Sequence, residues 1–336
     1  MHKSPGYEPR YSVTAHLLRL IESIASLKTK IELSTVSVAW VPTLAKEAFV
    51  RTAHSSTAIE GNPLSLKEVR ILAEGGDLPH ARPKHIKEVT NYFAALRFIT
   101  GNKNKKTISA EDVFKIHSII GKEVLDRGPL GACRDYQVYV GSHVPPKAKD
   151  VGRLMDDLLE WLNKRGQALP AVFSSAILHY RFEYIHLFGD GNGRTGRLLA
   201  MWELYRRKFD SHHIFSIDEV FLENRPRYYA ALDIVRKENE DLTSWLEFSA
   251  EAIELTLERV LSRIEAVRIS EKMTITLSPK QERLFNILQA GPLGIREIQE
   301  QLDVTKQGAH FLLKPLLESG LIKRVGGHKT GKYMLV

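Results

Sequence analysis

The amino-acid sequence predicts a mainly α-helical protein, and two observations carry this prediction. Apolar residues recur every three or four positions through much of the 336 residues, as at Leu154, Leu158 and Leu162, which is the spacing of an amphipathic helix. Segments with the alternating pattern of a β-strand are few and short. Hydrophobic residues make up 43% of the chain and charged residues 26%, proportions that are ordinary for a globular protein.

Two segments interrupt the helical pattern. Residues 134–144, RDYQVYVGSHV, are rich in β-branched and aromatic types around a central Gly-Ser pair, which predicts a short β-hairpin. Two prolines follow and end it. The second interruption, residues 270–279 (SEKMTITLSP), follows a long helical pattern over residues 242–267, and we interpret it as a linker.

Beyond this linker, the order of the elements predicts a winged helix-turn-helix. Three short helical segments, at residues 280–289, 295–301 and 305–319, precede two strand-like runs that flank a turn rich in glycine and lysine. Helix, helix, helix, strand, wing, strand is the order of this fold. From Ser278 onward the chain has nine lysine or arginine residues and five acidic residues, a net charge of +4 within the total of +8.

Composition narrows the classes of protein to consider. Cys133 is the only cysteine, so we expect no internal disulfide and no cysteine zinc site, and a reducing compartment is compatible with the chain. The polar N-terminus has no apolar run of the kind that a signal peptide needs, and no stretch reaches the ~20 apolar residues that span a bilayer. We expect a cytoplasmic protein without a membrane partner, and its positive charge permits an acidic partner such as a nucleotide or nucleic acid.

The strongest chemical signal is a glycine-rich stretch at residues 186–197, HLFGDGNGRTGR. Its glycines allow tight turns and close approach of a ligand, and the residues after them have the pattern of an amphipathic helix. A glycine-rich loop that leads into a helix N-terminus presents free backbone N–H groups and the positive end of the helix dipole, which together bind anions. Arg194 and Arg197 share one face of that helix, so both are placed to reach phosphate oxygens.

Two further side chains in this stretch indicate group transfer. Asp190 opposes a phosphate unless Mg²⁺ lies between them, and Mg²⁺ commonly takes one carboxylate plus substrate oxygens. His186 lies four residues earlier and is the natural general base. Each residue alone is more typical of a loop that caps a helix, with a histidine whose ring is hydrogen-bonded within the fold. Together they indicate phosphoryl or nucleotidyl transfer. A Walker A loop needs Gly-Lys-Ser/Thr, whereas residues 193–195 are Gly-Arg-Thr with a different glycine spacing.

The same stretch resembles the motif of the Fic family, H-x-F-x-D/E-G-N-G-R-x-x-R, at every fixed position. The commonest second residue of that motif is proline, where this chain has Leu187. Fic proteins share a helical core, and most transfer AMP from ATP to a tyrosine, serine or threonine hydroxyl of a protein, releasing pyrophosphate. The resemblance therefore implies a protein adenylyltransferase that uses ATP and Mg²⁺ and acts on a protein substrate, for which the chain itself is one candidate.

The resemblance also implies a role for each residue of the motif. His186 deprotonates the target hydroxyl, Asp190 holds Mg²⁺, the loop cradles the α- and β-phosphates, and the two arginines stabilise the β- and γ-phosphates. The expected nucleotide-binding residues within the motif are Gly191, Asn192, Gly193, Arg194, Gly196 and Arg197. We divide the chain accordingly into an N-terminal helical region, a Fic catalytic core and a winged helix, at residues 1–105, 106–268 and 269–336.

Two segments outside the motif are further candidates for substrate binding. The predicted hairpin lies upstream of the motif, where the family has its flap, and its edge could hold an extended target segment by strand addition, with Val138 and Tyr139 as the expected contacts. A purely structural hairpin fits the sequence equally well. Residues 224–232 resemble a family stretch that borders the nucleotide. Tyr228 and Tyr229 are therefore candidates for the adenine pocket, although a place in the hydrophobic core is the favoured interpretation.

A short segment near the N-terminus predicts inhibition. Residues 56–62, STAIEGN, resemble the inhibitory motif of the family, S/T-x-x-x-E-G/N. A glycine and a proline stop the preceding helix, so we expect Glu60 in its last turn, where a carboxylate opposes the helix dipole by about 0.3–1 kcal/mol. In proteins with this motif the glutamate pairs with the second arginine of the active site, here Arg197, and keeps it from the γ-phosphate. We therefore expect Ser56 and Glu60 to make the chain auto-inhibited.

Two other functions stay open. The chain could be a nucleotide-sensing DNA-binding regulator, with Lys306, Gln307 and His310 of a recognition helix (residues 304–314) in a groove. The residues expected to touch phosphates are then Lys323, Arg324, His328 and Lys329. Winged helices also serve as protein-docking modules, which is an equally good interpretation. Alternatively, the Fic site could remove AMP from a protein, with Glu60 positioning a water molecule.

Overall fold

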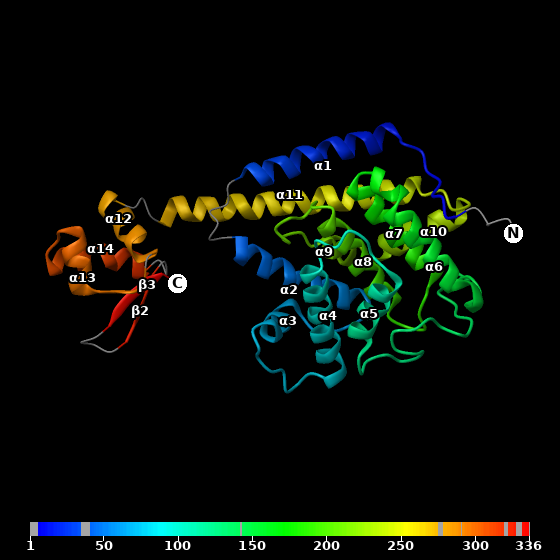
Figure 1. Ribbon diagram of the computed structural model, residues 1–336, viewed down its shortest axis with the longest axis horizontal. Coiled ribbons are helices and arrows are strands. Elements are labelled where there is room, and N and C mark those ends of the chain that lie inside the picture. Colours follow the sequence, from blue (N-terminus) through cyan, green and yellow to red (C-terminus); the bar gives the residue numbers. More distant parts are fainter. Residues whose placement is uncertain are drawn as a thin grey trace. The chain divides into compact units, whose positions relative to one another are not determined.

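The chain folds into two compact units of mainly helical structure. The computed structural model describes residues 6–34, 41–141, 143–274, 278–289, 291–318, 322–326 and 331–335. The units are Met1–Ser262 and Arg263–Val336, and their boundary falls within helix α11 (Thr243–Thr274), which Figure 1 shows in yellow. The predicted mainly α fold is confirmed. The regions predicted as residues 1–105 and 106–268 contribute to one unit up to Ser262.

The first unit contains the elements that carry the predicted site. Its helices are α1 (Ala15–Leu33), α2 (Val41–Ile59), α3 (Leu66–Ala73), α4 (Pro83–Gly101), α5 (Ala110–Gly121), α6 (Ala148–Asn163), the short 3-10 helix η1 (Arg165–Ala168), α7 (Ala171–Ile185), α8 (Asn192–Arg206), α9 (Ile217–Glu223), α10 (Arg225–Lys237) and the first part of α11. Local sequence determines several of their starts. Ser65 and Ser109 begin α3 and α5 as capping boxes with Glu68 and Asp112, which satisfy backbone N–H groups that the helix leaves without acceptors.

Helices α7 and α8 form the centre of this unit. Residues on every side of α7 are buried, among them Ile177, Leu178 and Phe182, as expected for a helix surrounded by protein. Helix α7 packs along α8, and Trp245 of α11 donates from Nε1 to the carbonyl of Ala176 at 2.8 Å. Within the described ranges, no helix combines the length and apolar character that crossing a lipid bilayer requires.

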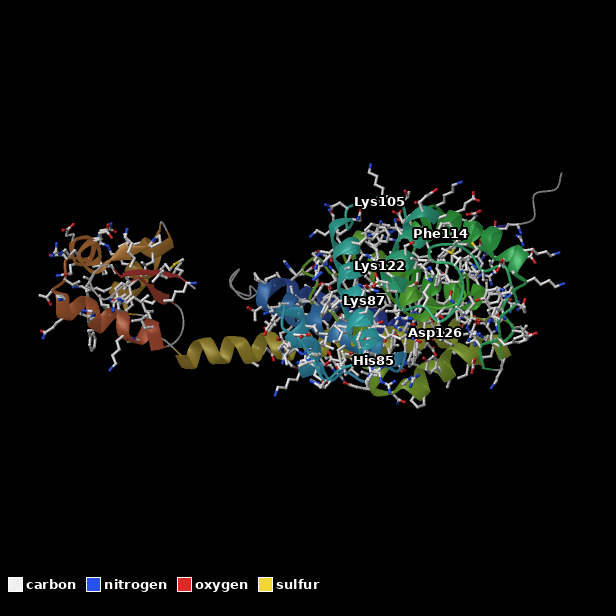
Figure 2. All side chains as sticks on the ribbon, turned by 90° about the horizontal axis from the view of Figure 1, so that it is seen from below. His85, Lys87, Lys105, Phe114, Lys122 and Asp126 are labelled. Atoms are coloured by element: carbon white, nitrogen blue, oxygen red, sulfur yellow. The ribbon has the colours of Figure 1, made fainter. Side chains whose placement is uncertain are left out.

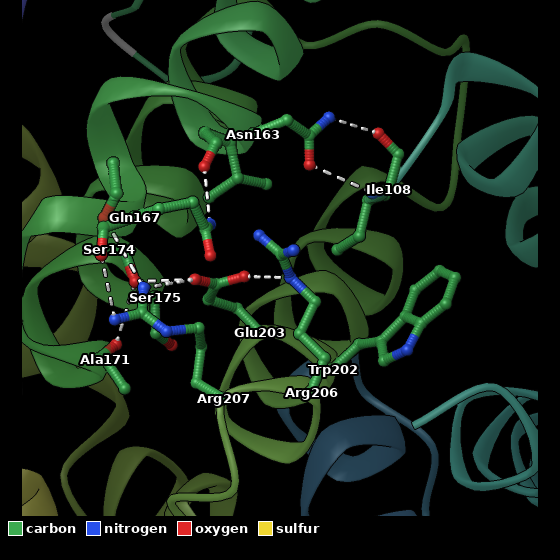
Figure 3. Close-up of polar contacts among 12 residues, drawn as sticks. Ile108, Asn163, Gln167, Ala171, Ser174, Ser175, Trp202, Glu203, Arg206 and Arg207 are labelled. Carbon is green, nitrogen blue, oxygen red and sulfur yellow. Dashed lines mark hydrogen bonds and ion pairs between the residues drawn. The ribbon is translucent and has the colours of Figure 1, made fainter. Parts of the chain in front are cut away.

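Figure 3 shows a buried carboxylate that ties the start of α7 to the end of α8. Glu203 is fully buried and accepts a hydrogen bond from Ser174 Oγ at 2.7 Å. Its carboxylate also pairs with Arg206 Nε, and Arg207 Nη1 lies 3.4 Å from it. A buried charge is tolerated when it is paired and hydrogen-bonded in this way. The contact joins the N-terminal end of α7 to the C-terminal end of α8, so the two helices are antiparallel and their other ends meet at the loop that contains the predicted motif.

The predicted hairpin at residues 134–144 does not form a β-ladder. Among its described residues the structure contains one isolated antiparallel bridge, between Val140 and His143, and Ser142 lies outside the described residues. The two backbone hydrogen bonds of this bridge measure 3.0 and 2.9 Å. Pairing stops there because the two prolines that follow have no N–H to donate. Residues 134–146 are called the flap segment below.

The second unit has a small sheet flanked by three helices. Its elements are α12 (Pro279–Gln289), β1 (Leu293–Gly294), α13 (Ile295–Leu302), α14 (Lys306–Glu318), β2 (Ile322–Val325) and β3 (Lys332–Leu335). The strand order is β1-β3-β2, and both pairings are antiparallel. Leu284, Ile298 and Leu313, one from each helix, lie in its hydrophobic core.

The three helices and two longer strands of this unit lie where the sequence predicts them. The predicted linker at residues 270–279 is in part wrong, because α11 continues to Thr274. Helical periodicity weakens in that segment, but its residues still permit helix. Residues 275–277 lie outside the described residues, and so do two of the predicted phosphate contacts, His328 and Lys329.

Candidate active site

The predicted base, His186, directly follows the last residue of α7. Its backbone is left-handed, with φ 50° and ψ 60°, a conformation that is uncommon for a residue with a side chain. Its amide donates to the carbonyl of Phe182 at 3.0 Å, and its carbonyl accepts from Arg134 Nε at 2.9 Å. These contacts hold the sharp turn that ends α7 and directs the chain into the loop.

The protonation state of His186 suits a general base. Burial lowers the pKa of His186 from 6.5 to about 4; the backbone of Glu183 opposes this shift, and the nearby charge of Arg134 adds to it. The imidazole is therefore neutral at neutral pH and has a lone pair. A general base must be in this state before it accepts a proton.

The loop between α7 and α8 is closed by a side chain of the motif itself. Asn192 Oδ1 accepts from the amide of Phe188, and Asn192 Nδ2 donates to the carbonyl of the same residue, both at 2.9 Å. Gly191 has φ 76°, which costs glycine little. The side chain of Asn192 is thus committed to the loop. The backbone amides of Asn192, Gly193 and Arg194 lie in the first turn of α8, where N–H groups have no acceptor within the helix, so they are the groups that face an anion.

A histidine outside the motif holds this loop from α5. His117 is fully buried and stacks on Phe188, with ring centroids 3.7 Å apart. Its Nδ1 accepts from the amide of Gly131 at 2.9 Å, so the proton is on Nε2, which donates to the carbonyl of Asp190 at 3.0 Å. Burial lowers the pKa of His117 to about 4, which keeps this tautomer neutral. Sequence reasoning missed His117, and the one available signal was a histidine on an otherwise apolar helix face.

Asp190 fits the predicted role of a Mg²⁺ ligand. Its Oδ1 accepts from the amide of Gly191 at 2.5 Å and its Oδ2 from the amide of Asp126 at 3.1 Å. Each oxygen keeps a lone pair, and 27% of the side chain is exposed. Mg²⁺ is commonly bound by one or two carboxylates together with waters and substrate phosphates. Among the described residues no cluster of three or more His, Cys, Asp or Glu occurs, so a Mg²⁺ ion held by Asp190 would take its other ligands from substrate oxygens and waters.

The second arginine of the motif is held by the end of α2. Arg197 Nη2 donates to Glu60 Oε1 at 2.7 Å and to the carbonyl of Ser56 at 2.9 Å, and its Nε donates to Ser56 Oγ at 2.7 Å. Its side chain is only 1% exposed. Asp218 Oδ2 of α9 lies 3.9 Å from the same Nε. The predicted pairing of Glu60 with Arg197 is therefore present. Glu60 lies one residue beyond the last turn expected for it, because α2 ends at Ile59.

The carboxylate of Glu60 also lies against the first turn of α8, at Gly193. A Cβ atom built on Gly193 would collide with Glu60 Oε1 and would approach Arg197 Nη1 to 3.1 Å. Only glycine therefore permits this approach. The carboxylate occupies the space beside the first turn of α8 and Arg197, where the charge and the backbone N–H groups favour a phosphate.

The remaining predicted nucleotide-binding residues differ in accessibility. Gly196 packs against Glu183 of α7, since a Cβ there would collide with Glu183 Oε1. Tyr228 is buried, stacks on Phe221 at 4.8 Å, and its hydroxyl lies 3.1 Å from His179 Nε2. Tyr228 is therefore a core aromatic, as the favoured interpretation had it.

The other candidate contacts lie at or near the surface. Tyr229 is 38% exposed, and Arg225 lies 5.5 Å from its ring centroid. In the flap segment Val138 is 5% exposed and Tyr139 is 72% exposed. The Val138 side chain faces the interior, so only its backbone is available to a target in strand addition, whereas the side chain of Tyr139 faces outward. Tyr139 keeps its predicted place.

A charged rim borders the loop on the side of α4 and the end of α5. Lys84 Nζ lies 2.5 Å from Asp126 Oδ1, and Lys87 Nζ lies 3.0 Å from Glu123 Oε2. Figure 2 labels Lys87 and Asp126 on this side. A pocket of about 280 Å³ lies between these side chains. The amide of Asp126 bonds Asp190, so the rim adjoins the loop, but each of its two lysines is paired with a carboxylate and the four side chains carry no net charge.

These observations define a helical protein with a glycine-rich loop that leads into the first turn of α8, a neutral histidine before the loop and a partly exposed carboxylate, Asp190, within it. Residues 107–204 match the model of the Fic/DOC family, so the chain contains a Fic domain. The chain is 33% identical over 222 residues to "Protein adenylyltransferase Fic" of Aedes aegypti, a match that covers 64% of this chain and 42% of that protein. It is 31% identical over 228 residues to "Protein adenylyltransferase fic-1" of Caenorhabditis elegans, covering 66% and 42%. The chain thus spans about two fifths of the length of these curated relatives.

Solved structures show the same fold. A Fic family protein from Desulfovibrio desulfuricans G20 superposes with a TM-score of 0.70 at 26% identity, over 98% of both chains. Fic-1 from Caenorhabditis elegans gives a TM-score of 0.65 at 26% identity, over 76% of this chain and 74% of that one. The resemblance inferred from residues 186–197 is confirmed at the level of the domain.

Proposed function

We propose that this protein is an adenylyltransferase that moves AMP from ATP to a tyrosine, serine or threonine hydroxyl of a protein. The observation that carries the proposal is the conjunction, within residues 186–197, of a neutral histidine, a partly exposed carboxylate and a helix N-terminus whose first amides have no acceptor within the helix. Relatives that match about two thirds of the chain, at 31–33% identity, bear the name of this activity.

Each group has one task in the proposed reaction. The first-turn amides of α8 bind the α- and β-phosphates, and Arg194 and Arg197 stabilise the β- and γ-phosphates. Asp190 holds Mg²⁺, which when bound neutralises phosphate charge. His186 accepts the proton of the target hydroxyl as its oxygen bonds to the α-phosphorus. The bond from that phosphorus to the bridging oxygen breaks, and pyrophosphate leaves.

We further propose that Glu60 restrains this activity. A γ-phosphate that binds Arg197 must displace the Glu60 carboxylate, because two anions repel each other in the same space. Displacement also breaks the hydrogen bonds that Ser56 accepts if the guanidinium moves. The resting chain is then poorly able to bind ATP in the productive position, and release of the end of α2 activates it.

One experiment tests the transfer and identifies the target together. The Glu60→Gly variant is incubated with cell lysate and an ATP analogue that carries a label on its adenosine, and labelled residues are identified by mass spectrometry. The proposal expects AMP on hydroxyl side chains of specific proteins, and none when His186→Ala is added. Label that appears equally with both variants, or on no protein, contradicts the proposal.

DNA binding by the second unit is the second candidate function. The order α12, β1, α13, α14, β2, β3 supports the proposal that residues 279–335 are a winged helix-turn-helix. Lys306, Gln307 and His310 are exposed on α14, and so are Lys323 and Arg324 on β2. Binding to duplex DNA should weaken by roughly one log unit per log unit of salt for each phosphate contacted. Phe311, 78% exposed on the same helix, suits a protein partner equally well, and salt-independent association would favour that partner.

A further inference from the structure

Side chains, rather than a β-ladder, close the flap segment. Gln137 Nε2, on the first arm, donates to the carbonyl of Pro145 on the second arm at 2.9 Å. The bridge between Val140 and His143 supplies the only backbone pair among the described residues of this segment. A single pair does not determine where such a segment lies, because isolated two-stranded hairpins are marginal in water. Its position must therefore come from contacts with the rest of the unit.

Arg134 supplies the first of these contacts. It is 2% exposed, and its guanidinium donates to three carbonyls: from Nε to His186 at 2.9 Å, from Nη1 to Tyr136 at 2.8 Å and from Nη2 to Pro146 at 2.5 Å. The rigid guanidinium thus joins the residues before and after the turn of the flap segment to the backbone of the predicted base, His186. No carboxylate among the described residues makes a salt bridge with Arg134. The C-terminal end of α7 compensates its charge in part, since helix carbonyls there favour a cation.

His143 supplies the second contact, from the other arm. It is buried, and its Nε2 lies 3.1 Å from the carbonyl of Tyr184. That carbonyl belongs to the last turn of α7, where the helix provides no donor of its own. The donor must be Nε2–H, because a carbonyl only accepts. Arg134 and His143 therefore satisfy two carbonyls at the end of α7, one on each side of Ile185, with side chains from the two arms.

Aromatic rings and an arginine pack around His143 and Tyr184. The His143 ring lies 5.3 Å from the ring of Tyr184. The guanidinium of Arg181 lies between the rings of Tyr184 and Tyr7, 4.6 Å from each centroid. Cation–π contacts of this kind strengthen when the groups are shielded from water. The N-terminal segment is thus part of the support on which the flap segment rests.

We propose that Arg134 and His143 are positioning residues that clamp the flap segment to the end of α7 and so set where a target backbone lies relative to His186. The inference rests on the proposed function, in which a target hydroxyl must reach His186, and it adds the groups that determine this placement. Small errors of placement cost transfer rate steeply. Both side chains bond backbone carbonyls of the flap segment and of the end of α7 and none of the residues proposed to bind phosphate. We therefore expect the clamp to affect binding of the acceptor protein and not of ATP.

The test uses the full chain in the Glu60→Gly background, with the acceptor protein identified in the lysate experiment. His143→Ala removes the donor, and His143→Gln restores one close to the position of Nε2. We expect His143→Ala to raise the KM for the acceptor about tenfold, the size of one lost hydrogen bond, with the KM for ATP unchanged. His143→Gln should recover most of the loss. Arg134→Lys keeps the positive charge but cannot donate to all three carbonyls in the geometry of a guanidinium. It should therefore also raise the KM for the acceptor.

Hydrogen exchange of the flap amides provides a readout independent of activity. Faster exchange at residues 135–141 in His143→Ala, but not in His143→Gln, supports the clamp. A matched control is His80→Ala, because His80 is an exposed histidine paired with Glu68. Equal acceptor KM and equal flap exchange in His143→Ala and its parent would overturn the inference. If the parent transfers no AMP, the proposed function fails. The comparison of flap hydrogen exchange between His143→Ala and the parent then tests by itself whether His143 holds the flap segment in place.

Discussion

Arg197 Nη2 donates a hydrogen bond of 2.7 Å to Glu60 Oε1, across a sequence separation of 137 residues. The same nitrogen donates to the Ser56 carbonyl, so the end of α2 binds the arginine through two residues. Gly193 allows the carboxylate to approach the loop that is placed to bind phosphate. The cation expected to meet a γ-phosphate is thus already paired with a carboxylate of its own chain.

Ser56→Ala should release Arg197 in part. The change removes the hydrogen bond from Arg197 Nε to Ser56 Oγ but keeps the Ser56 carbonyl and Glu60 as partners. A hydrogen bond to a charged group contributes about 1.5–3 kcal/mol. Calorimetric titration with ATP and Mg²⁺ should show tighter binding than in the wild type and weaker binding than in Glu60→Gly. An affinity equal to that of the wild type would remove Ser56 from the restraint.

The rate of AMP transfer should not fall as pH is lowered through 6.5, the ordinary pKa of histidine. The pKa of His186 is lowered to about 4 by burial, so the imidazole stays deprotonated as pH falls from 8 to about 5 and loses its function as a base only below that. Initial rates of AMP transfer by Glu60→Gly at saturating ATP and Mg²⁺ provide the measurement. A rate that halves near pH 6.5 would mean that the base has an ordinary histidine pKa.

Glu183 should make the first unit less stable as pH rises. Burial raises its pKa from 4.5 to about 7, although Arg197 lowers it, and its Oε1 has no hydrogen-bond partner. A raised folded-state pKa contributes stability that is complete below about pH 4.5 and is lost as pH rises through about 7. Glu183→Gln stays neutral, so its free energy of unfolding at pH 8 should exceed that of the wild type by up to about 3 kcal/mol.

Urea unfolding at pH 5 and pH 8, followed by tryptophan fluorescence, measures this difference. All four tryptophans precede residue 262, so the signal reports the first unit. At pH 5 the difference should fall to about 1 kcal/mol, because Glu183 is then protonated in the folded state while its unfolded-state carboxyl is largely ionised. A constant difference at both pH values would show that the substitution acts through packing and not through ionisation.

Asn192→Ala should loosen the phosphate loop. The substitution removes both hydrogen bonds to Phe188, and it leaves a buried backbone N–H and carbonyl without partners, at a cost of about 1–3 kcal/mol each. Exchange of the loop amides should accelerate and ATP affinity should fall. Asn192→Asp keeps one acceptor and should retain part of the protection. Unchanged loop exchange in Asn192→Ala would show that His117 alone maintains the loop.

Local patterns predicted much of this molecule. Helical periodicity predicted α12, α13 and α14 to within two residues at each end, because those helices bury one face against a small core. The motif at residues 186–197 predicted the loop and placed His186 directly before it, since its glycines and polar side chains lie within a dozen positions. In the flap segment the sequence predicted the turn and the prolines that end it, but β-propensity overestimated the pairing, which the described residues limit to one bridge between Val140 and His143.

Glu60 was predicted to act across the fold because it lies in a recognisable motif, but other residues that do so escaped prediction. His117 bonds a carbonyl 73 residues away, and Arg134 bonds one 52 residues away. Asp218 approaches Arg197 from α9. Nothing in the neighbouring sequence distinguishes these residues from an ordinary buried histidine or a surface charge. Their roles come from the antiparallel packing of α7 and α8 and from the elements around them, which no short window contains.

The central claim is that His186 transfers AMP and that Glu60 restrains it. The most direct test measures AMP incorporation from labelled ATP into protein for the wild type, Glu60→Gly, Glu60→Gln and Glu60→Gly with His186→Ala. We predict that Glu60→Gly exceeds the wild type about tenfold or more, that Glu60→Gln lies between them because it keeps the acceptor but not the charge, and that adding His186→Ala lowers incorporation ~10²–10⁴-fold. Equal incorporation by the wild type and Glu60→Gly, or incorporation that survives His186→Ala, would contradict the account.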